Sequence, residues 1–270
     1  MTMRHAWLII AHNEFGILQR LVSALDAPEC DFFLHVDRKV SALPDLQVSQ
    51  GRLHVLEDRV DVRWGSVSQI ECELTLLEAA RKEGPFDFYH IISGTTLPLM
   101  SREALDAFFA GNRGRCILTP VHKDQPYQET LKMHRRNFFL RNYTAKGLKG
   151  RISQYAWRAG IALQRLLGMT FNQEKDFYKA SNWLSLTQEA VEFLLTRRAE
   201  ILKTYRYSFC GDEYFVPSEL MASPLRESIL NCDHYLKCDI PRSTSGVFSL
   251  DDLPELERTG FLFARKFTDR

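Results

Sequence analysis

The 270-residue sequence lacks the short motifs by which many nucleotide-binding and metal-dependent enzymes are recognised. No Gly-x-Gly-x-x-Gly follows the first predicted strand, and no Gly-Lys-Ser or Gly-Lys-Thr occurs, so a dinucleotide fold and a P-loop are both disfavoured. An Asp-x-Asp pair is also missing. Enzymes that hold a sugar-nucleotide diphosphate through a divalent ion usually need such a pair. We therefore expect either no diphosphate ligand or one that is neutralised by cationic side chains, with no metal site.

Cysteine motifs and long apolar runs are scarce as well. The six cysteines form no Cys-x-x-Cys, and most of them lie in apolar segments, which favours free buried thiols in a reducing compartment over disulfides or a zinc site. No segment approaches the ~20 apolar residues of a membrane span. The first eleven residues are too short and too interrupted for a signal peptide. These absences predict a cytoplasmic protein.

Acidic residues are missing from one long stretch. Between Thr130 and Gln173 there is no Asp or Glu but nine Lys or Arg, whereas the remainder carries 26 basic and 34 acidic residues, a net charge of −8. The same stretch holds aromatic residues at 138, 139, 143, 155 and 157. Such a surface suits an anionic membrane, an anionic glycan or nucleic acid. A solvated basic helix pair on an acidic body is an equal alternative, and no recognised nucleic-acid module is present.

Apolar runs of strand length alternate with segments of helical spacing over the first 120 residues. The composition, 45% hydrophobic and 26% charged with a net charge of +1, is that of a globular protein. This pattern predicts one α/β domain over residues 1–270, with a mainly parallel sheet covered by helices on both faces and a basic aromatic insertion at about 130–173. Predicted strands cover 6–10, 31–36, 52–56, 86–92, 116–119, 180–186 and 235–240; predicted helices cover 14–26, 66–81, 102–110, 188–203, 214–221 and 251–257.

Polar residues follow three of the predicted strands. Ligands of open α/β sheets bind beyond the carboxyl ends of the strands, so His12, Asp37 and the pair Ser93–Gly94 are expected along one rim. His35 and Asp37 face the same side of a strand, but Arg38 and the lysine after it argue against a cation site there.

Two adjacent carboxylates, Asp212 and Glu213, follow a glycine. Gly211 permits a sharp bend, and Asp212 is a good N-cap for a helix over 214–221. Glu213 would then sit in the first turn near an apolar wall, where a carboxylate can accept a proton. A capping acid beside a solvated acid is the simpler interpretation. Arg242 and Lys266 are candidate phosphate ligands, although surface charge is the usual fate of such residues.

Six segments, in order along the chain, together resemble the core-2/I-branching β-1,6-N-acetylglucosaminyltransferases and peptide O-xylosyltransferases. They are His35-Val36-Asp37-Arg38-Lys39, Trp64-Gly65-Ser66-Val67, Ser93-Gly94 with Leu97-Pro98-Leu99, Ser181-Asn182-Trp183-Leu184-Ser185-Leu186-Thr187, Asp212-Glu213, and Leu262-Phe263-Ala264-Arg265-Lys266-Phe267. Each match alone is weak, but their shared order is strong, and they span nearly the whole chain outside the basic insertion.

The resemblance implies a GT-A-like fold and an inverting, metal-independent transfer from a UDP-sugar to a glycan hydroxyl. It implies Glu213 as the general base, and Lys266 with Arg242 as ligands of the diphosphate. It further implies that Asp37 contacts uracil and that Arg63 or Trp64 lies near the nucleotide. His12, Ser93, Gly94, Trp183 and Asp212 are candidate donor or acceptor contacts.

The expected role is the synthesis of a surface polysaccharide, with GlcNAc as the sugar transferred and the basic insertion near the inner membrane face. A UDP-xylose transferase of the same fold is one alternative. A glycan- or nucleotide-binding module without catalysis is another, against which the joint presence of Glu213, Arg242 and Lys266 speaks.

Overall fold

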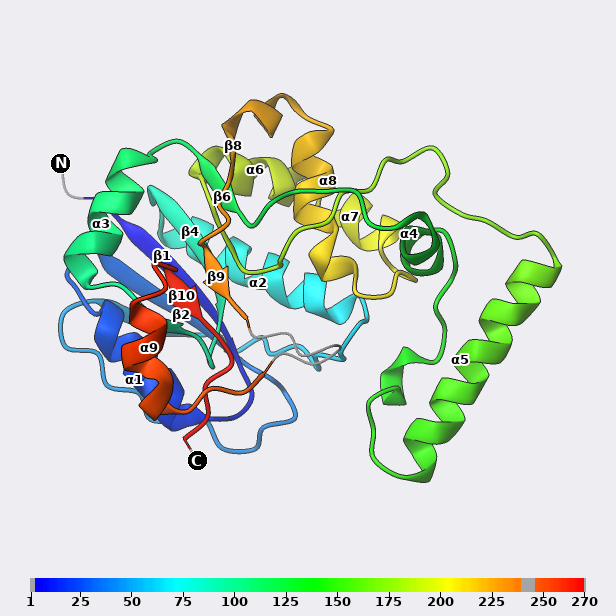
Figure 1. Ribbon diagram of the computed structural model, residues 1–270, viewed down its shortest axis with the longest axis horizontal. Coiled ribbons are helices and arrows are strands. Elements are labelled where there is room, and N and C mark those ends of the chain that lie inside the picture. Colours follow the sequence, from blue (N-terminus) through cyan, green and yellow to red (C-terminus); the bar gives the residue numbers. More distant parts are fainter. Residues whose placement is uncertain (1–2, 239–245, 270) are drawn as a thin grey trace.

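The computed structural model describes residues 3–238 and 246–269, and a twisted sheet lies at the centre of this part of the chain (Figure 1). The sheet has seven strands in the order β3-β2-β1-β4-β7-β6-β8, and β7 alone runs antiparallel to its neighbours. This arrangement confirms the predicted α/β class. The strands are β1 (His5–Ala11), β2 (Cys30–Val36), β3 (Arg52–Val55), β4 (Phe88–Ser93), β6 (Cys116–Leu118), β7 (Leu184–Leu186) and β8 (Ile229–Asn231).

Helices cover both faces of the sheet, and each face has its own hydrophobic core. One core includes side chains of α1 (Phe15–Leu25), α3 (Arg102–Gly111) and α9 (Leu253–Glu257). The other includes side chains of α2 (Ser68–Glu83), α6 (Gln188–Thr196), α7 (Arg198–Thr204) and α8 (Phe215–Met221). A small second sheet, β5-β10-β9, consists of Leu97–Pro98, Phe263–Ala264 and Leu236–Lys237.

The central strands are apolar because both of their faces are buried. β2 and β4 are buried at every position. Polar exceptions form a hydrogen-bonded chain across the strands: His5 Nδ1 lies 2.9 Å from His90 Nε2, His90 Nδ1 lies 2.7 Å from Ser185 Oγ, and Ser185 Oγ lies 2.9 Å from the Tyr235 hydroxyl. Burial lowers the pKa of His5 to about 4, so these histidines are neutral structural groups.

The parallel register brings the carboxyl ends of β1, β2 and β4 together. The backbone N–H of Asp37 donates to Ala11 O at 2.9 Å, and that of Gly94 donates to Ile10 O at 2.9 Å. The C-terminal segment returns to the same edge, where Leu99 N donates to Leu262 O and Phe267 N donates to Thr95 O, both at 2.9 Å. Three strand ends and the chain's last residues therefore share one rim.

Several predicted boundaries were wrong. The predicted helix 188–203 is capped by Thr187 as expected but divides at Arg197 into α6 and α7; there Arg197 N donates to Leu194 O at 3.2 Å, and the Thr196 hydroxyl donates to Phe193 O at 2.7 Å. The predicted strand 180–186 is short because Ser181 and Trp183 form a turn, in which the Ser181 hydroxyl accepts from Trp183 N at 3.2 Å.

The turn before α8 also differs from the prediction. Asp212 does not cap α8, which begins after Tyr214; it lies in a 3-10 helix, η2 (Gly211–Glu213). The left-handed residue is Cys210, with φ 53°. Gly211 is needed for a different reason: a Cβ there would collide with the Ser208 hydroxyl. The backbone turns because of Cys210, and the packing is tight because Gly211 has no side chain.

The basic stretch forms an arm that projects from the body (Figure 1). It consists of α4 (Pro126–Met133), a 3-10 helix η1 (Leu140–Asn142) and α5 (Leu148–Leu166). Within the described part of the chain, no helix is long and apolar enough to cross a membrane. None of the six cysteines, all of which are among the described residues, forms a disulfide, and three of them, at 30, 72 and 116, are buried.

Two carboxyl groups are buried where α2 packs against η2. Only 5% of the surface of Asp212 and 1% of that of Glu73 is exposed to solvent. Gln69 Nε2 donates to Asp212 Oδ2 at 2.7 Å, and Asn182 Nδ2 donates to Glu73 Oε1 at 3.3 Å. Burial and the neighbouring charge of Glu213 raise the pKa of Asp212 to about 7. Burial and the charge of Asp212 also raise the pKa of Glu73.

Because the pKa values of these two carboxyl groups are raised, we expect their contribution to the free energy of unfolding to fall as the pH rises. A carboxyl group whose pKa is higher in the folded state keeps its proton longer there, so the free energy of unfolding decreases between about pH 4 and pH 7. Asp212→Asn removes that penalty. The difference in the free energy of unfolding between the variant and the wild type should therefore be more favourable to the variant at pH 8 than at pH 4, by up to roughly 2–4 kcal/mol. Urea denaturation at both pH values measures this gain. The exposed Asp58→Asn is the control, and equal behaviour of the two variants would contradict the prediction.

Candidate active site

The rim formed by the strand ends holds Asp37 and His12. Asp37 is nearly buried, and its carboxylate accepts from Lys39 N at 2.9 Å and from Lys39 Nζ at 2.7 Å. The pKa of His12 is lowered chiefly by partial burial, and also by the charges of Lys266, Lys39 and Arg265, while Asp37 opposes the shift. The C-terminal segment lies close to the end of β1, because Phe267 N donates to Thr95 O in the turn whose Gly94 N donates to Ile10 O.

Ser93 and Gly94 form the third part of this rim. The hydroxyls of Ser93 and Thr95 are 2.8 Å apart, which shapes the turn after β4. A Cβ at Gly94 would come within 2.9 Å of the Ala11 Cβ, so only glycine allows β1 and this turn to approach so closely. The same turn accepts the hydrogen bond from Phe267 N, and Lys266 is thereby placed beside it.

Of the two neighbouring cations, Arg265 is partly buried and Lys266 is exposed. The carbonyl of Lys266 accepts from Phe248 N at 2.7 Å, which fixes the backbone. Partial desolvation and the charge of Arg265 lower the pKa of Lys266. Burial lowers the pKa of Arg265. Within residues 3–238 and 246–269, neither side chain forms a salt bridge with a carboxylate, and the Arg265 guanidinium hydrogen-bonds the Cys238 side chain. Arg242 lies outside the described residues.

Glu213 lies at the end of η2 in a charged cluster that the sequence analysis missed. Its carboxylate is 37% exposed and lies 3.3 Å from Lys179 Nζ. Lys179 Nζ also lies 3.9 Å from Asp124 Oδ2, and Lys132 Nζ lies 3.1 Å from that same oxygen. The sequence predicted an apolar wall beside the Glu213 carboxylate, but in the structure this carboxylate is paired with the cation of Lys179. Lys179 holds the carboxylate in place while a third of it stays open to solvent.

A short segment joins this cluster to the rim. Ala180 N donates to Glu213 O at 3.0 Å. Three residues further on, the ring of Trp183 stacks under the Arg265 guanidinium, whose carbon lies 4.6 Å from the ring centroid. Residues 180–183 therefore contact the backbone of Glu213 at one end and the Arg265 guanidinium at the other. The structure brings these predicted residues into one region although they are distant in sequence.

Arg63 and Trp64 connect the Asp37 group with the turn that carries Glu213. Arg63 Nη2 binds Asp61 Oδ2 at 2.7 Å, and Lys39 Nζ binds Asp61 Oδ1 at 3.1 Å, which connects Arg63 to the Asp37 group. Trp64 is 51% exposed, and its ring lies 5.3 Å from that of Phe209. Gly65 O accepts from Cys210 N at 2.9 Å. Trp64 therefore flanks the turn that carries Glu213.

The described residues contain no cluster of three or more His, Cys, Asp or Glu side chains arranged to hold a metal ion. His35 is a core group whose Nε2 accepts from Val60 N at 2.8 Å. Of the residues that sequence reasoning missed, Lys179 had a usable signal, because it lies two residues before the Ser181–Trp183 motif. Asp124 and Lys132 had none, because only folding brings them to Glu213.

Comparison with known proteins relates this arrangement to a family. The chain is 23% identical to xylosyltransferase oxt of Drosophila pseudoobscura pseudoobscura over 93% of its own length and 30% of that protein. It is 21% identical to the human N-acetyllactosaminide beta-1,6-N-acetylglucosaminyl-transferase over 52% of its length and 38% of that protein. The chain thus spans about a third of each of these relatives. The family model of the Core-2/I-branching enzymes matches residues 5–235, and the chain belongs to this family of glycosyltransferases.

Proposed function

We propose that this protein transfers a sugar from a UDP-sugar to a hydroxyl group of a glycan acceptor, with inversion at the anomeric carbon and without a metal ion. The observation that carries the proposal is the segment 180–183, which contacts Glu213 through Ala180 and Arg265 through Trp183. A carboxylate and a pair of cations at opposite ends of one short segment suit a displacement reaction, in which one side takes a proton and the other stabilises the leaving group.

In the proposed reaction Glu213 accepts the proton of the acceptor hydroxyl as its oxygen attacks the anomeric carbon. The bond between that carbon and the diphosphate breaks, and UDP leaves with the electron pair. Lys266 and Arg265 neutralise the negative charge on the diphosphate, since both lie at the rim without a carboxylate partner in the described part of the chain. Arg242 is a further candidate for this role. Fixed cations can replace the Lewis acid that a metal supplies in other enzymes.

The nucleoside would lie toward Asp37, Arg63 and the strand ends, and the acceptor toward Trp64 and Glu213. We take UDP-GlcNAc as the donor and a surface polysaccharide or its lipid-linked precursor as the acceptor. Similarity to a xylosyltransferase over 93% of this chain favours UDP-xylose as the second candidate donor. Product release with a panel of UDP-sugars distinguishes the two donors.

Glu213→Gln tests the general base. An amide cannot accept the proton, so kcat should fall by about 10²–10⁴ while UDP binding stays within about twofold of the wild type. Steady-state UDP release measures the first quantity and calorimetry the second. Glu227→Gln, at a side chain that is 89% exposed, is the matched control. Unchanged turnover in Glu213→Gln would favour a binding module without catalysis.

Lys266→Ala tests the diphosphate site. Loss of a charged hydrogen bond costs about 1.5–3 kcal/mol, so the Kd for UDP should rise by roughly 10- to 100-fold. Uridine, which has no phosphate, should bind the variant and the wild type equally well in calorimetry. Lys82→Ala, at an exposed side chain of α2, controls for the loss of one positive charge. Equal weakening of UDP and uridine would show that Lys266 acts on the fold and not on the diphosphate.

Chelation tests the independence from metal. Because the proposal assigns charge neutralisation to side chains, turnover in an excess of EDTA should remain within about twofold of its value in untreated buffer. Added Mn²⁺ or Mg²⁺ should give no increase beyond that range. A loss of activity on chelation that manganese restores would refute metal-independent transfer, although it would leave the family assignment intact.

A further inference from the structure

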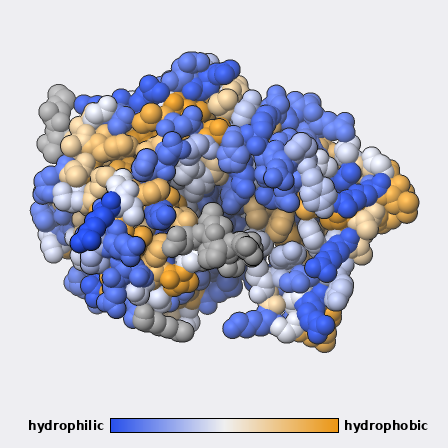
Figure 2. Space-filling view, viewed as in Figure 1, coloured by the Kyte–Doolittle hydropathy of each residue, from blue (hydrophilic) through white to orange (hydrophobic). Residues whose placement is uncertain are grey.

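Helix α5 has a surface that the proposed transfer reaction does not use. The helix runs along the projecting arm, and hydrophobic surface is visible at the outer end of this arm (Figure 2). Only four of its nineteen residues are buried: Gly150, Ser153, Ile161 and Gln164. Their spacing of three, eight and three residues places them on one side of the helix, which is the side that faces the rest of the arm.

The opposite side of α5 is apolar and exposed to solvent. We call it the outer face and define it by five residues with 55–82% exposure: Leu148, Ile152, Tyr155, Leu163 and Leu166. Their spacing of four, three, eight and three residues keeps them in a single stripe over five helical turns, or roughly 27 Å. The exposed Ala159 and Ala162 fill the gap in this stripe. An apolar stripe of this length marks an interaction site more often than a free surface.

A row of arginines borders the outer face. Arg151, Arg158 and Arg165 recur every seven residues and are all exposed. The Arg158 guanidinium lies 5.9 Å from the ring centroid of Tyr155, so the row directly adjoins the apolar stripe. No acidic residue occurs from 130 to 173, and the acidic residue of α4, Glu129, lies 3.4 Å from His134 Nε2 rather than beside this row. The α5 helix of a second copy would present the same arginines and no acidic residue.

We propose that the outer face of α5 lies on an anionic phospholipid membrane. An amphipathic helix with an apolar face and flanking cations inserts between headgroups and acyl chains, parallel to the membrane plane. Each cation near an anionic leaflet adds about 1 kcal/mol of attraction. The apolar stripe and the arginine row supply these two contributions side by side on one helix. The interaction requires neither donor nor acceptor, so it is independent of the proposed transfer reaction.

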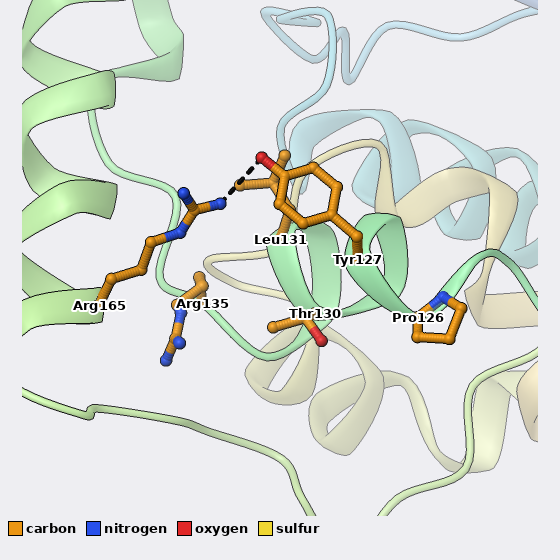
Figure 3. A pocket seen from close by; sticks show the side chains of 6 residues that line it. All are labelled: Pro126, Tyr127, Thr130, Leu131, Arg135 and Arg165. Atoms are coloured by element: carbon orange, nitrogen blue, oxygen red, sulfur yellow. Dashed lines mark hydrogen bonds between the residues drawn. The ribbon is translucent and has the colours of Figure 1, made fainter.

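A cavity of about 470 Å³ between α4 and α5 lies beside the last arginine of the row (Figure 3). Tyr127 and Leu131 line it together with Arg135 and Arg165. Arg165 Nη2 donates to the Tyr127 hydroxyl at 2.8 Å. Nε and Nη1 of Arg135 are shielded from solvent and have no hydrogen-bond acceptor among the described residues. One guanidinium can bind phosphate oxygens through two parallel hydrogen bonds, so the two arginines that line this cavity suit the headgroup phosphate of a lipid.

The inner side of α5 connects this surface to the candidate active site. The Trp157 ring lies 5.7 Å from that of Phe209, and Phe209 packs against Trp64. Trp157 Nε1 also donates to Asn137 Oδ1 at 2.8 Å. A helix held on the membrane would therefore keep the Glu213 region close to the lipid surface.

Vesicle co-sedimentation of the full chain tests the proposal. Wild-type protein should bind vesicles with 30% phosphatidylglycerol at least tenfold more tightly than pure phosphatidylcholine vesicles, and the difference should shrink in 0.5 M salt. The triple variant Arg151→Gln, Arg158→Gln, Arg165→Gln should lose at least tenfold in affinity for the anionic vesicles. The double variant Ile152→Glu, Leu163→Glu should lose binding by a similar factor, because it places charge in the apolar stripe.

Matched controls carry the same changes at other exposed positions. The control for the triple variant removes the same charge from exposed positions of the body: Arg20→Gln, Lys82→Gln, Arg226→Gln. The control for the double variant places two acidic residues at exposed apolar positions outside the arm: Leu43→Glu, Val247→Glu. Both controls should bind like the wild type. Arg135→Gln should weaken binding about tenfold, whereas its exposed neighbour Arg136→Gln should not.

Three outcomes would overturn the proposal. One is equal binding of the wild type to anionic and neutral vesicles. The second is equal loss in the arm variants and their controls. The third is a dimer, seen by sedimentation equilibrium, that Ile152→Glu, Leu163→Glu dissociates while vesicle binding is unchanged, since the outer face would then be covered by a second copy. Circular dichroism verifies that each variant is folded.

Discussion

The candidate site depends on how residues 180–183 are held. Ala180 N donates to Glu213 O, and the Trp183 ring supports the Arg265 guanidinium. Glu213 belongs to η2, whereas Arg265 belongs to the C-terminal segment that lies against the turn after β4. Antiparallel β7 begins directly after this segment and ties it to β4 and β6. The central sheet therefore fixes the distance between the proposed base and the proposed diphosphate ligands.

Charge is arranged differently at the two ends of that segment. Around Glu213 the carboxylates and lysines are paired, with Lys179 between Glu213 and Asp124. Beneath it, Asp212 and Glu73 are buried, and burial raises the pKa of both carboxyl groups. At the other end Arg265 and Lys266 are adjacent, and partial desolvation lowers the pKa of each. Two neighbouring cations at the rim favour an anionic ligand, because a bound diphosphate would relieve their mutual repulsion.

The projecting arm has two faces with different roles. Its inner side packs against Phe209 through Trp157, next to the turn that carries Glu213. Its outer side exposes an apolar stripe bordered by arginines. Ser153 and Gln164 are buried on the inner side, where their side chains donate to the backbone carbonyls of Phe139 and Arg136. Packing thus fixes the helix orientation that presents the outer face to its surroundings.

Sequence alone determined the α/β class, most strand and helix positions, the family resemblance and the acid-free character of residues 130–173, because apolar periodicity, strand ends and charge are local properties. Only the tertiary structure decided which distant groups meet. It replaced the predicted cap at Asp212 by a buried carboxyl bonded to Gln69. It placed Lys179 at Glu213 and Trp183 under Arg265. Such contacts join residues from separate elements, and their geometry follows from sheet register and helix packing, which no short stretch of sequence encodes.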